Sequence, residues 1–417
     1  MGEVFAGATL PPLPAMTSPA RIERLLPFLV LTVFLDLVGF GIILPLLPSY
    51  ASDMGGTADT VGVLLASFAA AQLLATPLLG RASDRLGRRV VITVSLGANV
   101  IAMLLFALAA HRHALWLLFA SRILAGATSG NIGACQAAIA DVSHGPDRTR
   151  AMGKLGAGIG LGMMMGPWIG GRVSKLGEAG PPLSAAAMAL VALLGVLVFM
   201  PETNPAVRRG GGEPPVVAPP RRSFKELMVN PRIATMAGLY FMTFLYMTTL
   251  QTALALLATQ RFHWTKDHIG DLFGLFGLVM IVVQSLLVGP LSQRVAPVYI
   301  VRGAALLAMG ALAVIAFAPV SAVMLVGLVL MATALGFTQP LLASLASHYG
   351  GAGQQGAVLG LAQLWGSLAR AAGPLLWGML YQHVGPSAAF VGGGVAALGA
   401  FLVASLLRQD DEPASST

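Results

Sequence analysis

The sequence contains very few charged residues. Only 10% of its 417 residues are Asp, Glu, Lys or Arg, whereas 56% are hydrophobic and the mean hydropathy is +0.79. Soluble domains contain about 25% charged residues, and no soluble core of this length accommodates so much apolar surface. The composition therefore excludes a water-soluble fold and predicts that lipid surrounds most of the chain.

Cysteine and the common catalytic motifs are also scarce. The single cysteine, Cys135, can form no internal disulfide, and the seven His residues are scattered. The sequence has no His-Glu-x-x-His motif, no Ser/Lys or paired intramembrane Asp arrangement and no Gly-x-x-x-x-Gly-Lys phosphate loop. These absences argue against an enzyme, and we expect no catalytic residue, no metal site and no cofactor.

The chain does contain long apolar blocks. A bilayer core of about 30 Å requires about 20 apolar residues per helix. We count twelve such blocks, at residues 25–48, 60–79, 90–110, 114–139, 152–171, 183–200, 233–257, 269–290, 298–318, 320–342, 355–378 and 388–407. Strands of a membrane barrel alternate over about ten residues, so these continuous blocks favour helices. The predicted fold class is an all-α integral membrane protein with twelve transmembrane helices.

Positive charges are distributed unevenly between the predicted loops. If the amino terminus is cytoplasmic, 18 Lys and Arg residues lie in cytoplasmic segments, five lie outside, and two, Arg122 and Arg370, lie within helices. Positive residues in short loops stay in the cytoplasm. We therefore expect both termini in the cytoplasm. The compact loops suggest a prokaryotic source, for which the expected location is the cell inner membrane. The pI of about 10.1 then reflects topology and not nucleic-acid binding.

A segment rich in Pro, Gly and Arg divides the chain. Residues 201–232 contain no apolar run of helix length, which predicts a flexible cytoplasmic linker. The linker separates a six-helix bundle at 25–200 from a second one at 233–407, with cytoplasmic tails at 1–24 and 408–417. The basic lead-in that follows Met16 suggests that translation begins there.

The two halves contain similar segments. GRASDRLGRR from Gly80 resembles GPLSQRVAP from Gly289, 209 residues later, and GPWIGG at 166–171 resembles GPLLWG at 373–378, 207 residues later. Two matches at nearly the same period indicate an internal duplication. Membrane proteins built from such repeats are typically transporters with a site between the halves.

Four segments resemble signatures of the major facilitator superfamily. GRASDRLGRR resembles the loop 2–3 signature, and GIGLGMMMGPWIGG at 158–171 resembles the helix 5 signature of proton-driven antiporters. RILAGATSG at 122–130 is similar to the helix 4 signature. LDLVGFGIILPLLP at 35–48 is similar to the helix 1 signature, most closely to that of tetracycline efflux antiporters. The matching residues of the first two signatures are Gly80, Asp84, Arg85, Gly87, Arg88, Arg89, Gly162, Gly166, Pro167, Gly170 and Gly171.

This resemblance implies two pseudo-symmetric six-helix bundles that rock around a central cavity and exchange an organic molecule for protons. One departure concerns the third helix, which has no acidic residue. Tetracycline efflux proteins carry an aspartate there, and Ala102 occupies about its place. The departure argues against tetracycline itself as the substrate.

Two charges lie deep within predicted helices. Asp36 is near the middle of the first helix, where an unpaired carboxylate is costly unless it is protonated. Arg122 lies about eight residues into the fourth helix and requires an anion or carbonyl groups nearby. We predict that both serve proton coupling, a role that the resemblance implies for the helix 4 arginine. One alternative is a static polar contact between helices, and for Arg122 another is substrate binding.

The four Arg residues of GRASDRLGRR are enough to keep this segment in the cytoplasm. Its topology therefore does not explain Asp84, Gly80 and Gly87. A carboxylate at a helix end can accept hydrogen bonds from Arg or from the amino terminus of a neighbouring helix. Glycine permits a tight turn. We predict that GRASDRLGRR forms a gating loop that holds the two halves together. The alternative is a plain positively charged loop.

Polar and aromatic residues inside helices are candidate substrate contacts. Amides, aromatic rings and Met suit a bulky amphipathic molecule, although each such residue can instead form an interhelical hydrogen bond. The candidates are Gln72, Asn131, Gln136, Tyr246, Gln251, Gln284, Gln339, Gln363, Trp365 and Arg370. Asp271, near the start of the eighth helix, matches no motif.

The expected function is proton-coupled export of a small, drug-like amphipathic molecule, as in antibiotic efflux, by a monomer that binds no nucleic acid. A uniporter or symporter of a metabolite, such as a sugar or organic acid, is one alternative, against which the helix 5 signature argues. A membrane receptor is another, but it gives no reason for Asp36 and Arg122 at lipid depth.

Overall fold

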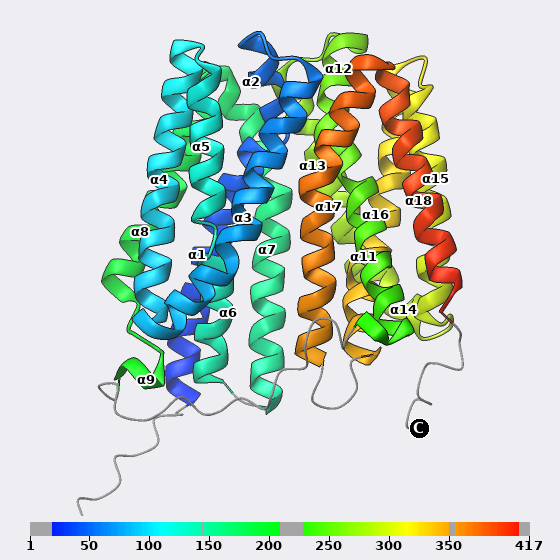
Figure 1. Ribbon diagram of the computed structural model, residues 1–417. Helices are drawn as coiled ribbons and strands as arrows, with labels where there is room; N and C mark the ends of the chain where they lie inside the picture. Colours follow the sequence, from blue (N-terminus) through cyan, green and yellow to red (C-terminus); the bar gives the residue numbers. More distant parts are fainter. Residues whose placement is uncertain (1–18, 144, 209–227, 350–354, 408–417) are drawn as a thin grey trace, which may run out of the picture.

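Residues 19–143, 145–208, 228–349 and 355–407 are described by the computed structural model, and every element in these ranges is helical. The long helices run roughly parallel to one another and extend over about the same height (Figure 1). We call the end where α1 begins and α18 ends the terminal end. The other end, which carries α2 and α12, is the opposite end.

The first half contains two short helices and seven longer ones. They are α1 (Pro19–Ile43), α2 (Leu47–Asp53), α3 (Ala58–Leu86), α4 (Arg88–Arg112), α5 (Leu115–Ala127), α6 (Asn131–Val142), α7 (Gly145–Val173), α8 (Gly180–Phe199) and α9 (Pro205–Arg208).

The second half contains eight helices. They are α11 (Pro231–Thr249), α12 (Ala255–Phe262), α13 (Lys266–Val282), α14 (Val288–Ser292), α15 (Pro297–Ala316), α16 (Ser321–Tyr349), α17 (Gln355–His383) and α18 (Pro386–Ser405). A π-helical turn joins α11 to α12, and another joins α13 to α14, at Leu250–Leu254 and Val283–Leu287.

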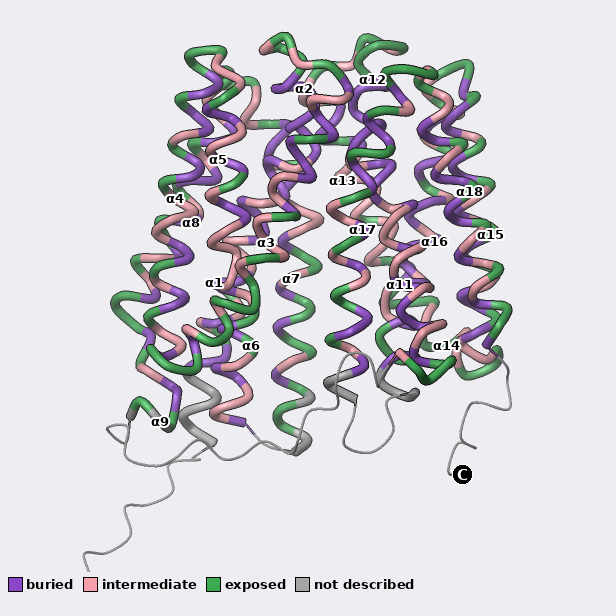
Figure 2. Tube along the Cα trace, in the orientation of Figure 1, coloured by how far each residue is buried: buried purple, intermediate pink, exposed green. Residues whose placement is uncertain are grey.

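Nine helices in the described part of the chain are long and apolar enough to cross a membrane. The other three predicted blocks are also helical, as α5 with α6, α7 and α17. Many Leu, Ile and Val side chains are exposed on the outer faces of these helices, for example Val191, Leu194 and Val198 on α8. Figure 2 shows such exposed positions along the whole height of the bundles. The all-α membrane fold in two bundles is confirmed.

Two predicted helices are interrupted. The first does not continue to residue 48 but ends at Ile43, before a turn and α2. The fourth breaks between α5 and α6, where Thr128 Oγ1 and Ser129 Oγ donate to the carbonyls of Leu124 and Gly126, both at 2.8 Å. Such bonds from side chain to backbone compete with the helical hydrogen-bond pattern.

The boundaries of the tails and the linker remain predictions. Residues 1–18, which include Met16, and residues 408–417 lie outside the described residues, as does 209–227 of the predicted linker. The part of the linker that is described contains α9.

The two bundles meet through α3 with α17 and α7 with α13. One large cluster of buried apolar residues runs through both bundles and includes Leu46 and Leu64 of the first half and Leu254 of the second. A smaller cluster, with Leu29 and Ile139, belongs to the first bundle alone. The halves therefore share a core toward the opposite end.

Candidate functional site

A small cavity inside the first bundle contains both predicted proton-coupling residues. It has a volume of about 110 Å³, and its lining includes Asp36 of α1, Gln72 of α3 and Arg122 of α5. Asn99 and Asn131 also line it, and Asn99 Nδ2 donates a 3.0 Å hydrogen bond to Asp36 Oδ1. The structure thus brings Asp36 and Arg122 together with two predicted substrate contacts. We call this space the Asp36 cavity.

Arg122 is buried without an ion pair to any described residue, at 3% exposure. Its Nε donates to Ser121 Oγ at 3.3 Å, and Nη2 lies 3.7 Å from Met103 Sδ. Its guanidinium lies 5.1 Å from the centre of the Phe106 ring. A buried cation without an anion is energetically costly. Because the Asp36 carboxylate lines the same cavity, it is the anion available to Arg122.

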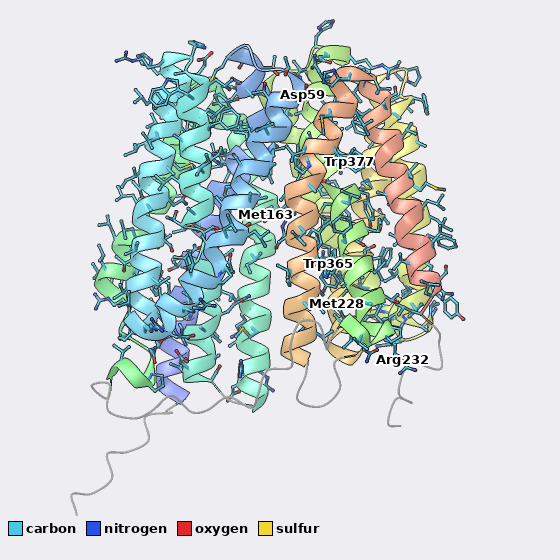
Figure 3. All side chains as sticks on the ribbon, in the orientation of Figure 1. Asp59, Met163, Met228, Arg232, Trp365 and Trp377 are labelled. Atoms are coloured by element: carbon cyan, nitrogen blue, oxygen red, sulfur yellow. The ribbon has the colours of Figure 1, made fainter. Side chains whose placement is uncertain are left out.

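A larger cavity of about 380 Å³ lies between the bundles, where α1, α7, α11, α13 and α16 meet. Figure 3 shows Met163 on the first bundle's side of this interface and Trp365 on the second bundle's side. Its lining contains no charged residue among those described. The lining residues with polar, aromatic or thioether side chains are Met163, Met164, Met247, Met280, Phe244, Phe273, Phe276, Gln251, Gln284 and Gln339. We call it the central cavity.

The predicted substrate contacts do not form a single site. Gln251, Gln284 and Gln339 line the central cavity, whereas Gln72 and Asn131 line the Asp36 cavity. The remaining four with uncharged side chains line neither cavity. Tyr246 is fully buried, Gln136 and Gln363 are exposed, and Trp365 packs its ring 5.9 Å from that of Phe241.

Arg370 lies beside the central cavity. Its guanidinium is 4.6 Å from the centre of the Phe244 ring, which lines that cavity, and Nη2 donates to Ser367 Oγ at 2.6 Å. Within the described ranges it forms no ion pair. Arg370 itself does not line the central cavity.

Ion pairs join the two halves at the opposite end. Each pairs a residue of the first half with one of the second, and Asp59 in Figure 3 marks their level. The ion pairs are Asp53 with Lys266 at 2.7 Å, Arg172 with Asp271 at 3.0 Å and Lys175 with Asp267 at 3.3 Å, and a hydrogen bond of 2.8 Å joins Asp59 to His383. At the terminal end, no ion pair between described residues joins the halves.

Tyr50 of α2 packs beneath one of these pairs. The Lys266 ammonium lies 4.0 Å from the centre of its ring. Burial raises the pKa of the Tyr50 hydroxyl, which donates to the backbone carbonyl of Glu178 at 2.6 Å. Tyr50 thus connects α2 to the segment before α8 and supports the contact with the second half.

The glycines of the helix 5 signature allow close packing of α7. A Cβ atom at Gly166 would lie 2.7 Å from Gly41 Cα of α1, and Gly162 and Gly170 also face α1. A Cβ atom at Gly171 would lie 2.9 Å from the Cα of Gly270 in α13. Small residues permit such backbone contact between membrane helices. Pro167, between these contacts, lines the central cavity.

The predicted gating loop is almost entirely helical, which corrects the loop assignment. Gly80 to Leu86 form the end of α3, α4 begins at Arg88, and only Gly87 lies between them. Gly87 has φ +104°, a conformation that favours glycine. A Cβ atom at Gly80 would meet open space, so no close approach explains that glycine in this structure.

The charged groups at this corner contact only the first half. Arg88 Nη1 pairs with Asp84 at 2.6 Å, and Arg88 Nε pairs with Asp141 at 3.0 Å. The Glu202 carboxylate accepts hydrogen bonds from the backbone N–H groups of Arg88 and Arg89 at 2.9 and 3.1 Å. The predicted contact between the halves through Asp84 is thus not formed among the described residues of this structure.

Sequence reasoning missed Asp141 and Glu202. Both are acidic residues at the ends of apolar blocks, Asp141 after the fourth and Glu202 after the sixth. Under the predicted topology, both lie on the same side of the membrane as Asp84. That shared side was the available signal, because opposite charges at neighbouring helix ends attract.

Comparison with known proteins identifies relatives along most of the chain. The family model described as Major Facilitator Superfamily matches residues 29–374 and 236–417. The Escherichia coli "Tetracycline resistance protein, class C" is 34% identical over 267 residues, which cover 63% of this chain and 66% of that protein. The human "Major facilitator superfamily domain-containing protein 10" is 28% identical, with 94% of each chain covered.

Solved structures have the same fold. The crystal structure of the human organic anion transporter MFSD10 matches with a TM-score of 0.65 at 26% identity, over 93% of this chain and 100% of that chain. The nucleoside transporter NupG matches with a TM-score of 0.73 at 14% identity over 92% and 98% of the two chains, which shows the fold alone. The chain belongs to the Major Facilitator Superfamily and is a transporter of that family.

Proposed function

We propose that this transporter exports a small amphipathic organic molecule in exchange for protons. The observation that carries the proposal is the separation of two cavities. The Asp36 cavity, with a carboxylate and a buried cation, lies inside the first bundle, and the uncharged central cavity lies between the bundles. A proton and a substrate can therefore occupy different sites, and coupled exchange can use such an arrangement.

The chemistry of the central cavity supports an amphipathic substrate. Met side chains adapt to irregular apolar shapes, and Phe rings supply flat apolar contact. Gln251, Gln284 and Gln339 contribute amide donors and acceptors that orient a ligand within an otherwise apolar cavity.

The contacts between the halves support alternating access. We assign the opposite end to the outside and the terminal end to the cytoplasm, because the predicted cytoplasmic segments carry most of the Lys and Arg residues. The ion pairs then close the outer side. No ion pair between described residues joins the halves at the terminal end, from which we infer that this conformation opens to the cytoplasm. An exporter loads its substrate in this conformation.

Two kinds of substrate are candidates, a drug-like amphipathic molecule and an organic anion. The relatives include tetracycline resistance proteins and a human organic anion transporter. Ala102, which stands where tetracycline efflux proteins carry an aspartate, is fully buried and does not line the central cavity. Arg370, without an ion pair beside an acid-free cavity, favours an organic anion as the second candidate.

The test is transport by purified protein in liposomes with an imposed pH gradient. Fluorescent amphipathic probes that are cationic, neutral or anionic are supplied, and a pH-sensitive dye reports proton movement. Proton exchange predicts that probe movement follows the pH gradient and stops when a protonophore is added. Probe movement that ignores the protonophore indicates a uniporter, and substrate and protons moving in the same direction indicate a symporter.

A further inference from the structure

A third cavity lies between α1 and α7 in the terminal half of the first bundle. It has a volume of about 800 Å³ and is lined largely by apolar residues, including Leu31 of α1 and Leu161 of α7. Asp147, Arg150 and Lys154 line the part nearest to the terminal end. We call it the outer groove.

The outer groove lies on a different face of α7 from the central cavity. Residues 150, 154, 157 and 161 line the groove, whereas 156, 160, 163 and 167 line the central cavity. The two stripes are offset by six residues, which is about 240° around a helix of 3.6 residues per turn. Leu31 of α1 and Leu161 of α7 are 51% and 43% exposed, so the groove is open at the surface of the first bundle. The groove therefore faces the surroundings of the protein and not the transport pathway.

The length of the groove matches one leaflet of a bilayer. From Asp147 to Leu161, fourteen residues of α7 rise about 21 Å at about 1.5 Å per residue. Half of a hydrocarbon core of about 30 Å is about 15 Å, and the headgroup layer adds several ångströms. The charged part of the groove thus reaches the headgroup level while the apolar part extends into the hydrocarbon.

The charges in the groove favour an anion. Lys154 is exposed and forms no ion pair within the described ranges. Arg150 lies 3.9 Å from Asp147, and both side chains are more than half exposed, so this pair is weak. Two cations and one acid leave net positive charge at the headgroup level.

We propose that the outer groove binds one anionic phospholipid of the leaflet at the terminal end. Its phosphate contacts Arg150 and Lys154, and one acyl chain lies along Leu31, Ala157 and Leu161. The occupant is a lipid, because a soluble anion would leave the apolar part of the groove unfilled. The site is independent of the transported molecule, so it stands or falls separately from the proposed export.

The test is lipid binding to the purified full-length protein in mild detergent, measured by native mass spectrometry. Phosphatidylglycerol and phosphatidylcholine with identical acyl chains are compared as probes. Each Lys or Arg near a membrane surface contributes about a factor of five in affinity for anionic lipid. The double variant Arg150→Gln/Lys154→Gln should therefore bind phosphatidylglycerol about thirtyfold more weakly. Arg148→Gln, an exposed cation that does not line the groove, is the matched control and should bind as the parent does.

A second variant tests the apolar part. Ala157→Trp fills the groove without changing charge, and it should weaken binding of both lipids. Equal binding of the two lipids by the parent overturns the proposal, as does full phosphatidylglycerol binding by both groove variants. Displacement of the lipid by a transported probe assigns the groove to substrate instead and also overturns it. Elution of each variant as a single folded species confirms that a lost signal reflects the groove.

Discussion

Asn99 Nδ2 of α4 donates a hydrogen bond of 3.0 Å to Oδ1 of Asp36 in α1. A side-chain amide carries both donors and an acceptor, so Asn99 can serve either protonation state of its partner. When the carboxyl of Asp36 is charged, the amide nitrogen donates to it. When the carboxyl is protonated, the amide oxygen can accept from it. The pair therefore accommodates a proton without leaving a polar group unsatisfied in lipid depth.

Asp36→Asn should abolish proton-coupled transport, because an amide of the same size cannot bind and release a proton. Exchange of substrate across the membrane without a pH gradient should persist, since the central cavity is untouched. Both activities are measured in liposomes. Asp36→Glu, which retains a carboxyl group, is the matched control and should keep part of the coupling. Undiminished proton-driven export by the Asn variant would refute the role of Asp36.

Arg122→Leu should leave the fold at least as stable and yet abolish transport. A buried cation without an ion pair has lost its hydration without a compensating anion, so replacing it by an apolar residue removes that cost of desolvation. The thermal unfolding midpoint in detergent and the rate of transport are measured on the same preparation. A purely structural arginine predicts the reverse result, with a lower midpoint and transport reduced only in proportion to folded protein.

The sequence predicted the architecture well because lipid imposes a simple rule. A membrane-spanning helix must supply about 20 apolar residues, and a charged residue such as Asp36 within one is energetically costly and therefore usually functional. The contacts at α3–α4 were less predictable. Arg88 was expected in a gating loop, but its side chain pairs with Asp141, which is 53 residues away in the sequence. No local pattern reports which distant helix end lies beside it.

The substrate contacts were predicted only in part, for a related reason. Sequence periodicity places Gln136 and Gln251 equally well inside a helix, yet Gln136 is exposed and Gln251 lines the central cavity. The difference depends on how each helix is rotated against its neighbours, which packing across the bundle determines. The spacing of residues along the sequence does not report how each helix is rotated.

Asp84→Asn should change transport more than stability. Asp84 is 70% exposed and contacts Arg88 at the surface, so the pair contributes at most about 1 kcal/mol to the described state. If Asp84 joins the halves when the terminal end closes, the variant should slow transport while membrane insertion and the unfolding midpoint stay unchanged. Transport rate, membrane yield and thermal unfolding are the three measurements.

Glu202→Gln provides the contrast to Asp84→Asn. Its carboxylate accepts from two backbone N–H groups at the start of α4, and an anion there stabilises a helix by about 1 kcal/mol. This variant should therefore lower the unfolding midpoint, which Asp84→Asn should not. If Asp84→Asn transports normally, Asp84 has no role in gating, and the segment is only a positively charged connection between α3 and α4.

Gly171→Ala should open the opposite end. The space beside Gly171 is filled by the backbone of α13, which cannot move aside as a flexible side chain could. The new Cβ atom would lie 2.9 Å from Gly270 Cα, so α7 and α13 must separate. Overpacking of this kind costs about 1–3 kcal/mol in the conformation that contains it.

Spin labels on Cys introduced at Ser52 and Val384, exposed residues of the two halves, report the separation by double electron–electron resonance. The distribution should shift to longer distances. Gly153→Ala, on the same helix where a Cβ atom meets nothing, should leave it unchanged, and an unchanged distribution in Gly171→Ala would show that this contact does not hold the end closed.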